Sequence, residues 1–183
     1  MLEKMKSFKK IDAHSHVGYF GSWSDVGITP EELVAQMDEY NVEKTVISTF
    51  PIAELARELD IPLMIHTGHP PFSLPWSVAQ LADIYPDVTM VMIHMGHGNG
   101  MYVQPAIDMA KKYPNLYLET SGMPMHTKIK EAYETVGADR IMWGLDAPFH
   151  HPTVEMQRTI VSGLTDEQLE DVFYNNAKKL LKL

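Results

Sequence analysis

The chain contains no cysteine, which excludes disulfide bonds and thiolate metal ligands and makes a cytoplasmic setting the expected one. It has no apolar run near the roughly 20 residues that a membrane-spanning helix needs. Its basic start, residues 1–10, is followed by Asp12, His14 and His16 and not by the long apolar core of a signal peptide. We therefore expect no membrane partner and no secretion signal.

Positive charge is scarce as well. The 24 Asp and Glu residues outnumber the 15 Lys and Arg residues, which gives a net charge of -9. Because affinity for nucleic acid comes mainly from clustered basic side chains, we expect no nucleic-acid partner. The sequence has no phosphate-binding glycine loop and no serine nucleophile elbow, and Gly96–Gly100 lacks the dinucleotide-binding pattern. These absences favour a small-molecule substrate and no nucleotide cofactor.

What the chain does have is an alternation of short apolar runs with amphipathic stretches, which is typical of strand–helix units around a parallel sheet. Its 183 residues show no internal linker, so we expect one domain over residues 1–183. A helix is expected from Thr29, a capping residue, to about Tyr40. Further helices are expected at about 51–59, 76–85, 101–113 and 126–136, and from Thr165 onward. Strands are expected at about 11–17, 44–49, 62–67, 88–95, 116–121 and 141–145.

Residues able to bind a metal stand at or near the carboxyl ends of four of these strands, where parallel sheets and barrels place their active sites. His14 and His16 are two residues apart and so point to the same face of a strand. His66 and Asp146 end two later strands. We predict that these four residues bind one divalent ion, most simply zinc, which accepts imidazole and carboxylate ligands and leaves a position open for water.

His94 ends the strand that follows the one carrying His66, and it is the predicted catalytic partner of the metal-bound water. A bound cation lowers the pKa of water to about 7, and an imidazole can accept or return its proton. Any one histidine alone is more often a structural residue, so the prediction depends on four strand ends agreeing. His69 and His97 are interpreted as solvated or structural, whereas His150 and His151 lie in a loop that could contact substrate or be solvated.

Several motifs resemble, in the same order along the chain, those of the amidohydrolase superfamily, within it the metal-dependent hydrolase and decarboxylase branch often called amidohydrolase 2. The similar segments are Ile11–His16, Ile65–Gly68, Ile93–Gly96, Leu116–Gly122, Gly144–Pro148 and Asn176–Leu181. The resemblance implies a distorted eight-stranded barrel with one divalent metal, usually zinc. It implies that His14, His16 and His66 are metal ligands, that His94 is the acid–base group, and that Asp146 is a ligand that also moves a proton.

The chain departs from the family pattern at two places. Leu145 stands where the family usually has a serine, and the third and fourth strand–helix units are missing between Phe50 and Pro51. Because an eight-unit barrel takes about 250 residues, we expect an α/β fold that is a shortened or distorted TIM-like barrel with about six parallel strands. A second copy of the chain could cover the gap, since exposed sheet edges are normally paired or covered.

The first function that this pattern favours is a metal-dependent hydrolase of a lactone, amide or carboxylic acid derivative, with His94 and Asp146 as catalytic residues. The alternative within the family is a non-oxidative decarboxylase, because the same residues suit both reactions. A third possibility is a metal-binding scaffold without activity, which the short segment between Phe50 and His66 motivates.

Overall fold

The computed structural model describes residues 10–15, 18–19, 27–47, 53–71, 73–97 and 100–183. Contacts divide the chain into two compact units, unit 1 (Met1–Ile52) and unit 2 (Ala53–Leu183), and each is described by itself. The expectation that residues 1–183 form a single domain stays a prediction.

Unit 1 contains two parallel strands, β1 (Lys10–Ser15) and β4 (Val42–Ile47), with helix α2 (Pro30–Tyr40) between them in sequence. The predicted start of α2 is confirmed. The Thr29 N–H donates to Glu32 Oε2 at 2.8 Å, and the Glu32 N–H donates to the Thr29 hydroxyl at 3.2 Å, which is a capping box. A short antiparallel pair, β2 (Gly18–Tyr19) and β3 (Gly27–Ile28), was not expected from the sequence.

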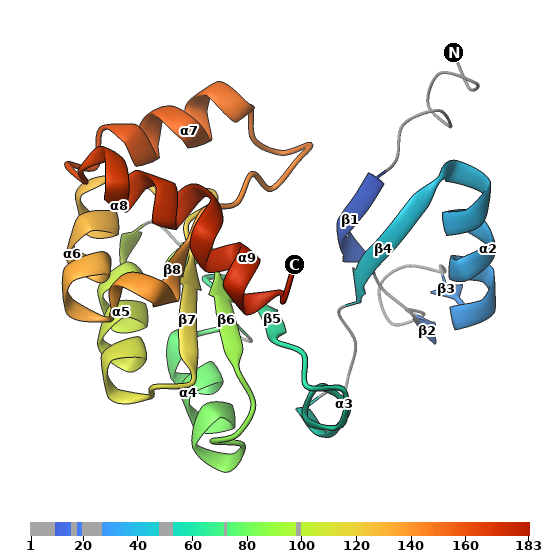
Figure 1. The fold of residues 1–183 in the computed structure, drawn as a ribbon. Helices are drawn as coiled ribbons and strands as arrows, with labels where there is room; N and C mark the ends of the chain where they lie inside the picture. Colours follow the sequence, from blue (N-terminus) through green and yellow to red (C-terminus); the bar gives the residue numbers. More distant parts are fainter. Residues whose placement is uncertain (1–9, 16–17, 20–26, 48–52, 72, 98–99) are drawn as a thin grey trace. The chain divides into compact units, whose positions relative to one another are not determined.

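Unit 2 is built on four parallel strands in the order of the chain, so each strand pairs with the next one. They are β5 (Leu63–His66), β6 (Met90–Ile93), β7 (Leu116–Glu119) and β8 (Ile141–Met142). Helix α3 (Ala53–Leu59) precedes β5. Helices α4 (Pro75–Ile84), α5 (Val103–Lys112) and α6 (Thr127–Thr135) connect the successive strands and lie side by side along the sheet (Figure 1).

The core of unit 2 lies between this sheet and its helices. The strand residues Met90, Val91, Met92, Leu116, Leu118 and Ile141 are fully buried. Helix α5 buries Val103, Ala106, Ile107 and Ala110, which recur at the spacing of one helix face. Strands that are covered in this way read as continuous apolar runs, which explains why the four strands of unit 2 could be predicted from the sequence.

The C-terminal part forms helices α7 (Pro152–Ile160), α8 (Asp166–Glu170) and α9 (Asn176–Leu180), with a wider helical turn at Asp171–Asn175. The predicted capping start at Thr165 is confirmed, since Thr165 and Gln168 exchange side-chain-to-backbone hydrogen bonds. Helix α7 was not predicted. Among the helices of the described ranges, none has the length and apolar character needed to cross a bilayer.

Candidate functional site

Polar side chains gather at the carboxyl edge of the sheet in unit 2. His66 is the last residue of β5, His94 directly follows β6, Glu119 ends β7, and Asp146 lies four residues beyond β8. The His66 and His94 rings meet edge to face with centroids 4.6 Å apart, and His94 Nε2 lies 4.0 Å from Asp146 Oδ2. The structure therefore brings together His66, His94 and Asp146, as the sequence predicted for these three.

His94 is held in one orientation by residues at and just beyond the end of β7. Its Nδ1 lies 2.9 Å from the Ser121 carbonyl oxygen and 2.8 Å from the Ser121 hydroxyl. That hydroxyl donates to Glu119 Oε2 at 2.8 Å, and a carbonyl oxygen can only accept. Both contacts therefore assign the ring proton to Nδ1. The other nitrogen, Nε2, is left as a base on the side of Asp146.

Burial has a clear effect on the charge of His94. The side chain is almost entirely buried, and desolvation lowers its pKa below the usual value, while the Ser121 carbonyl and the Asp146 carboxylate act in the opposite direction. His94 is therefore favoured as a neutral base at neutral pH.

Glu119 accepts hydrogen bonds from the backbone at His94 and Ser121. The His94 N–H donates to Glu119 Oε2 at 3.1 Å, and the Ser121 N–H donates to Oε1 at 2.5 Å. His94 has a φ of 69°, and Met95 has a φ of 47°, so both adopt the left-handed conformation that is unfavourable for such side chains. The bond from the His94 N–H to Glu119 helps to hold this turn.

Glu119 is itself a costly group to bury. Desolvation raises its pKa to about 7, although the hydrogen bonds from Ser121 and from the His94 N–H favour the ionised form. A Cβ atom on Gly144 would lie 2.0 Å from Glu119 Oε1, so only glycine fits beside this carboxyl group.

His66 keeps an exposed face, yet enough protein surrounds it to affect its titration. Burial, followed by the nearby His94 and His69, lowers the pKa of His66 to about 4. Its Nε2 lies 2.6 Å from His69 Nδ1, so the two rings share one proton. His66 is therefore neutral at neutral pH, which is the form of imidazole that binds metals.

Asp146 is also contacted from the loop that follows it. Its Oδ2 lies 3.6 Å from His150 Nε2, and the φ of Asp146 is 56°. His150 Nδ1 lies 2.9 Å from Oε1 of Glu155, a residue of α7 that is only 1% exposed. Of the two loop histidines left open by the sequence, His150 therefore reaches the site, whereas the His151 ring accepts the Thr153 N–H at 3.2 Å and caps α7.

The remaining histidine near the site, His97, donates from Nδ1 to the Gly122 carbonyl oxygen at 2.7 Å. This hydrogen bond fits the interpretation of His97 as a structural residue. His69 instead lies directly against the predicted ligand His66, with the two rings stacked 4.8 Å apart.

The four predicted metal ligands are divided between the two units of the chain. Within the described ranges, no group of three His, Cys, Asp or Glu side chains is arranged to hold a metal ion. Unit 2 provides His66 and Asp146, whereas His14 belongs to unit 1 and His16 lies outside the described residues. A neutral imidazole and a carboxylate are suitable donors for a divalent ion, so the residues present fit such a group. The full ligand set stays a prediction.

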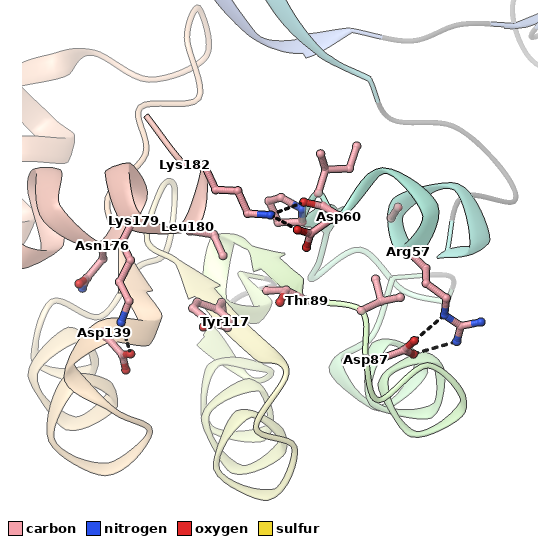
Figure 2. A pocket seen from close by; sticks show the side chains of 14 residues that line it. Arg57, Asp60, Asp87, Thr89, Tyr117, Asp139, Asn176, Lys179, Leu180 and Lys182 are labelled. Atoms are coloured by element: carbon pink, nitrogen blue, oxygen red, sulfur yellow. Dashed lines mark hydrogen bonds and ion pairs between the residues drawn. The ribbon is translucent and has the colours of Figure 1, made fainter.

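A cavity of about 220 Å³ lies at the opposite, amino-terminal edge of the same sheet (Figure 2). Its charged side chains are paired with one another. Arg57 contacts Asp87 at 2.7 and 2.8 Å, Lys179 contacts Asp139 at 3.1 Å, and Lys182 contacts Asp60. Because active sites of parallel sheets and barrels form at the carboxyl ends of the strands, this cavity is not part of the candidate site.

Sequence reasoning assigned no role to Glu119, Ser121, Glu155 and Arg158, all of which support the site. Glu119 and Ser121 had a detectable signal, because an acid and a hydroxyl end a buried apolar strand in the same manner as the histidines do. Glu155 and Arg158 had none, since the helix that carries them was not expected.

Comparison with known proteins identifies the family of the chain. The family model described as Amidohydrolase matches residues 26–183, and the chain therefore belongs to the amidohydrolase family, a family of metal-dependent enzymes. The decarboxylase orsB of Emericella nidulans is 25% identical in an alignment 205 residues long, which covers 94% of this chain and 60% of that protein. The chain thus spans less than two thirds of the length of this relative.

Solved structures show the fold. An uncharacterised TIM-barrel protein from Bordetella bronchiseptica superposes with a TM-score of 0.64 at 21% identity, covering 92% of this chain and 66% of that one. A dihydroxybenzoic acid decarboxylase from Polaromonas sp. JS666, with bound manganese and the inhibitor 2-nitroresorcinol, has a TM-score of 0.57 at 19% identity, covering 84% of this chain and 64% of that one. The predicted fold class, a shortened TIM-like α/β barrel, is confirmed.

Proposed function

We propose that the chain acts as a metal-dependent, non-oxidative decarboxylase of a cyclic, hydroxylated carboxylic acid. The observation that carries this proposal is the meeting of His66, His94 and Asp146 at the carboxyl edge of the sheet. Decarboxylases among its relatives support this reaction over hydrolysis of a lactone or amide, which was the first expectation from the sequence. Hydrolysis uses the same groups and becomes the second candidate.

The reaction breaks the bond between a ring carbon and the carboxylate carbon, releases carbon dioxide and adds one proton to the ring carbon. His94 Nε2 is the nitrogen that we assign to this proton transfer, because Nδ1 is occupied by Ser121 and Nε2 faces the site. His94 takes up the proton from solvent or from Asp146 and then delivers it. The network below the ring keeps Nε2 in position during both steps.

A bound divalent ion would supply positive charge to hold the substrate's oxygen atoms. We assign His66 and Asp146 as ligands from unit 2, together with His14 and His16 as the sequence predicts. Zinc was the expected ion, whereas a structural neighbour contains manganese, so both belong in the test. A cytoplasmic setting and a second copy over the missing units also remain proposals from the sequence.

The test is to purify the protein without chelator, supply Mn²⁺ or Zn²⁺, and offer a panel of dihydroxybenzoic acids alongside cyclic amides and lactones. We expect carbon dioxide in equal amount to the acid that is consumed, and about one divalent ion per chain by elemental analysis. His14→Ala should lose most of that ion. Hydrolysis of an amide or lactone without carbon dioxide would favour the second candidate, and metal uptake without any turnover would favour the scaffold.

A further inference from the structure

Helix α7 buries a polar face. Glu155 and Thr159 are each 1% exposed, whereas the apolar residues Val154, Met156 and Ile160 are between 41% and 52% exposed. A buried carboxylate is unfavourable unless charge and hydrogen bonds compensate it. Because this arrangement reverses the usual pattern of a surface helix, the buried acid needs an explanation other than packing.

One oxygen of Glu155 is firmly held. Its Oε2 accepts from the Gly122 N–H at 3.0 Å and from Arg158 Nη1 at 2.5 Å. Gly122 directly follows Ser121, the residue that contacts His94, so α7 is tied to the edge of the sheet where the candidate site lies. These two contacts fix the direction of the carboxyl group.

The other oxygen, Oε1, is directed at His150. It is buried and has no partner with hydrogen-bond geometry, yet His150 Nδ1 lies 2.9 Å away. His150 is thus the group within reach of a buried acid oxygen.

His150 also lies close to Asp146. Its second nitrogen, Nε2, is 3.6 Å from Asp146 Oδ2. The ring is confined by Gly122, since a Cβ atom at that position would lie 3.2 Å from both Cε1 and Nε2 of His150. The four side chains form a row in which Arg158 contacts Glu155, Glu155 contacts His150, and His150 contacts Asp146.

We propose that Glu155 is a positioning residue that acts through His150 to orient the Asp146 carboxylate for metal binding. The inference rests on the proposed function, because it takes Asp146 as a metal ligand. Outer groups that hydrogen-bond to a ligating carboxylate or imidazole fix its direction, and their loss typically weakens metal affinity or activity by about 10- to 100-fold. A purely structural Glu155 would instead tie α7 to Gly122 and leave the metal affinity unchanged.

The experiment measures the affinity of the metal-free protein for Mn²⁺ by isothermal titration, together with its unfolding by urea. The variants are Glu155→Gln, His150→Gln and both combined. Glu134→Gln is the matched control, because Glu134 is an exposed acid of α6 paired with Lys130 at 3.8 Å and is outside the site. Both single variants should weaken Mn²⁺ binding by about 10- to 100-fold. The control should bind as the unaltered chain does.

The double variant tests the route. If Glu155 acts through His150, the double variant should bind no more weakly than His150→Gln alone, since the two changes remove one chain of contacts. Fully additive losses would show that Glu155 does not act through His150, and unchanged affinity in Glu155→Gln would overturn the proposal. If Glu155→Gln fails to fold, His150→Gln decides in the same way. An unaltered chain that takes up no divalent ion would overturn the proposed function and this inference with it, whereas normal uptake with unaffected variants overturns the inference alone.

Discussion

The two sides of the candidate site differ in how tightly their groups are held. On the β7 side, Glu119, Ser121 and His94 are buried and joined by hydrogen bonds of 2.5 to 3.1 Å. On the α7 side, Asp146 is partly exposed, and the imidazole nitrogens of His150 and His94 lie 3.6 and 4.0 Å from its Oδ2. Direct hydrogen bonds therefore order the proton-transfer group, while the proposed metal ligand Asp146 is held by longer contacts.

The largest effect is expected from removing the ordered imidazole. His94→Gln should lower the rate of carbon dioxide release by about 10²- to 10⁴-fold, because a positioned acid–base group contributes this much. Substrate affinity should change far less. The measurement is a steady-state rate with a dihydroxybenzoic acid, and His126→Gln, at an exposed position outside the site, is the control. Equal activity of the two variants would show that the β7 side does not carry the proton.

Crowding the β7 side should be the next largest effect. Gly144→Ala places a Cβ atom 2.0 Å from Glu119 Oε1, so the carboxyl group must move and its bonds to Ser121 and His94 must break or lengthen. We expect a loss of about 3 kcal/mol in the free energy of unfolding, at the upper end of the usual range for overpacking.

Urea denaturation measures this loss, and the double variant Gly144→Ala/Glu119→Ala supplies the control. Because Glu119 is the group that clashes, the double variant should lose less stability than the sum of the losses in Gly144→Ala and Glu119→Ala alone. If the losses are strictly additive, the alanine at position 144 does not displace the Glu119 carboxyl group.

The raised pKa of Glu119 predicts a dependence of stability on pH. A carboxyl group whose pKa is about 7 when folded and 4.5 when unfolded binds its proton more tightly in the folded state. Its contribution to stability is therefore fully present below the unfolded pKa and is lost as pH rises through the folded one. Between pH 5 and pH 8 this amounts to about 2 to 3 kcal/mol.

The measurement compares urea denaturation of the unaltered chain and Glu119→Gln at pH 5 and pH 8. The unaltered chain should lose this much more stability than the variant over that interval. The difference between the two proteins removes the contribution of other titrating groups. Parallel pH profiles would show that the β7 side does not hold an acid with a raised pKa.

The same contrast explains how much could be predicted from the sequence. Runs such as Met90–Met92 are apolar and buried on both faces, so they indicated parallel strands, and the parallel arrangement then placed His66 and His94 at one edge. Helix α7 could not be found in this way, because its buried face carries Glu155 and Thr159 in place of apolar residues. Its cap is also His151 and not one of the usual Ser, Thr, Asp or Asn residues. The contacts of the α7 side were therefore visible only in three dimensions.

The smallest effect is expected at the start of α7. His151→Ala removes the ring nitrogen that accepts the Thr153 N–H at 3.2 Å, so one N–H at the start of the helix loses its partner. We expect a loss of no more than about 1 kcal/mol in the free energy of unfolding, since Pro152 still favours a helix start and the site is open to water. His151→Asn, which restores a capping oxygen, should recover most of it in the same urea titration. A loss several times larger would mean that the α7 side is held as rigidly as the β7 side, and the contrast between the two would no longer stand.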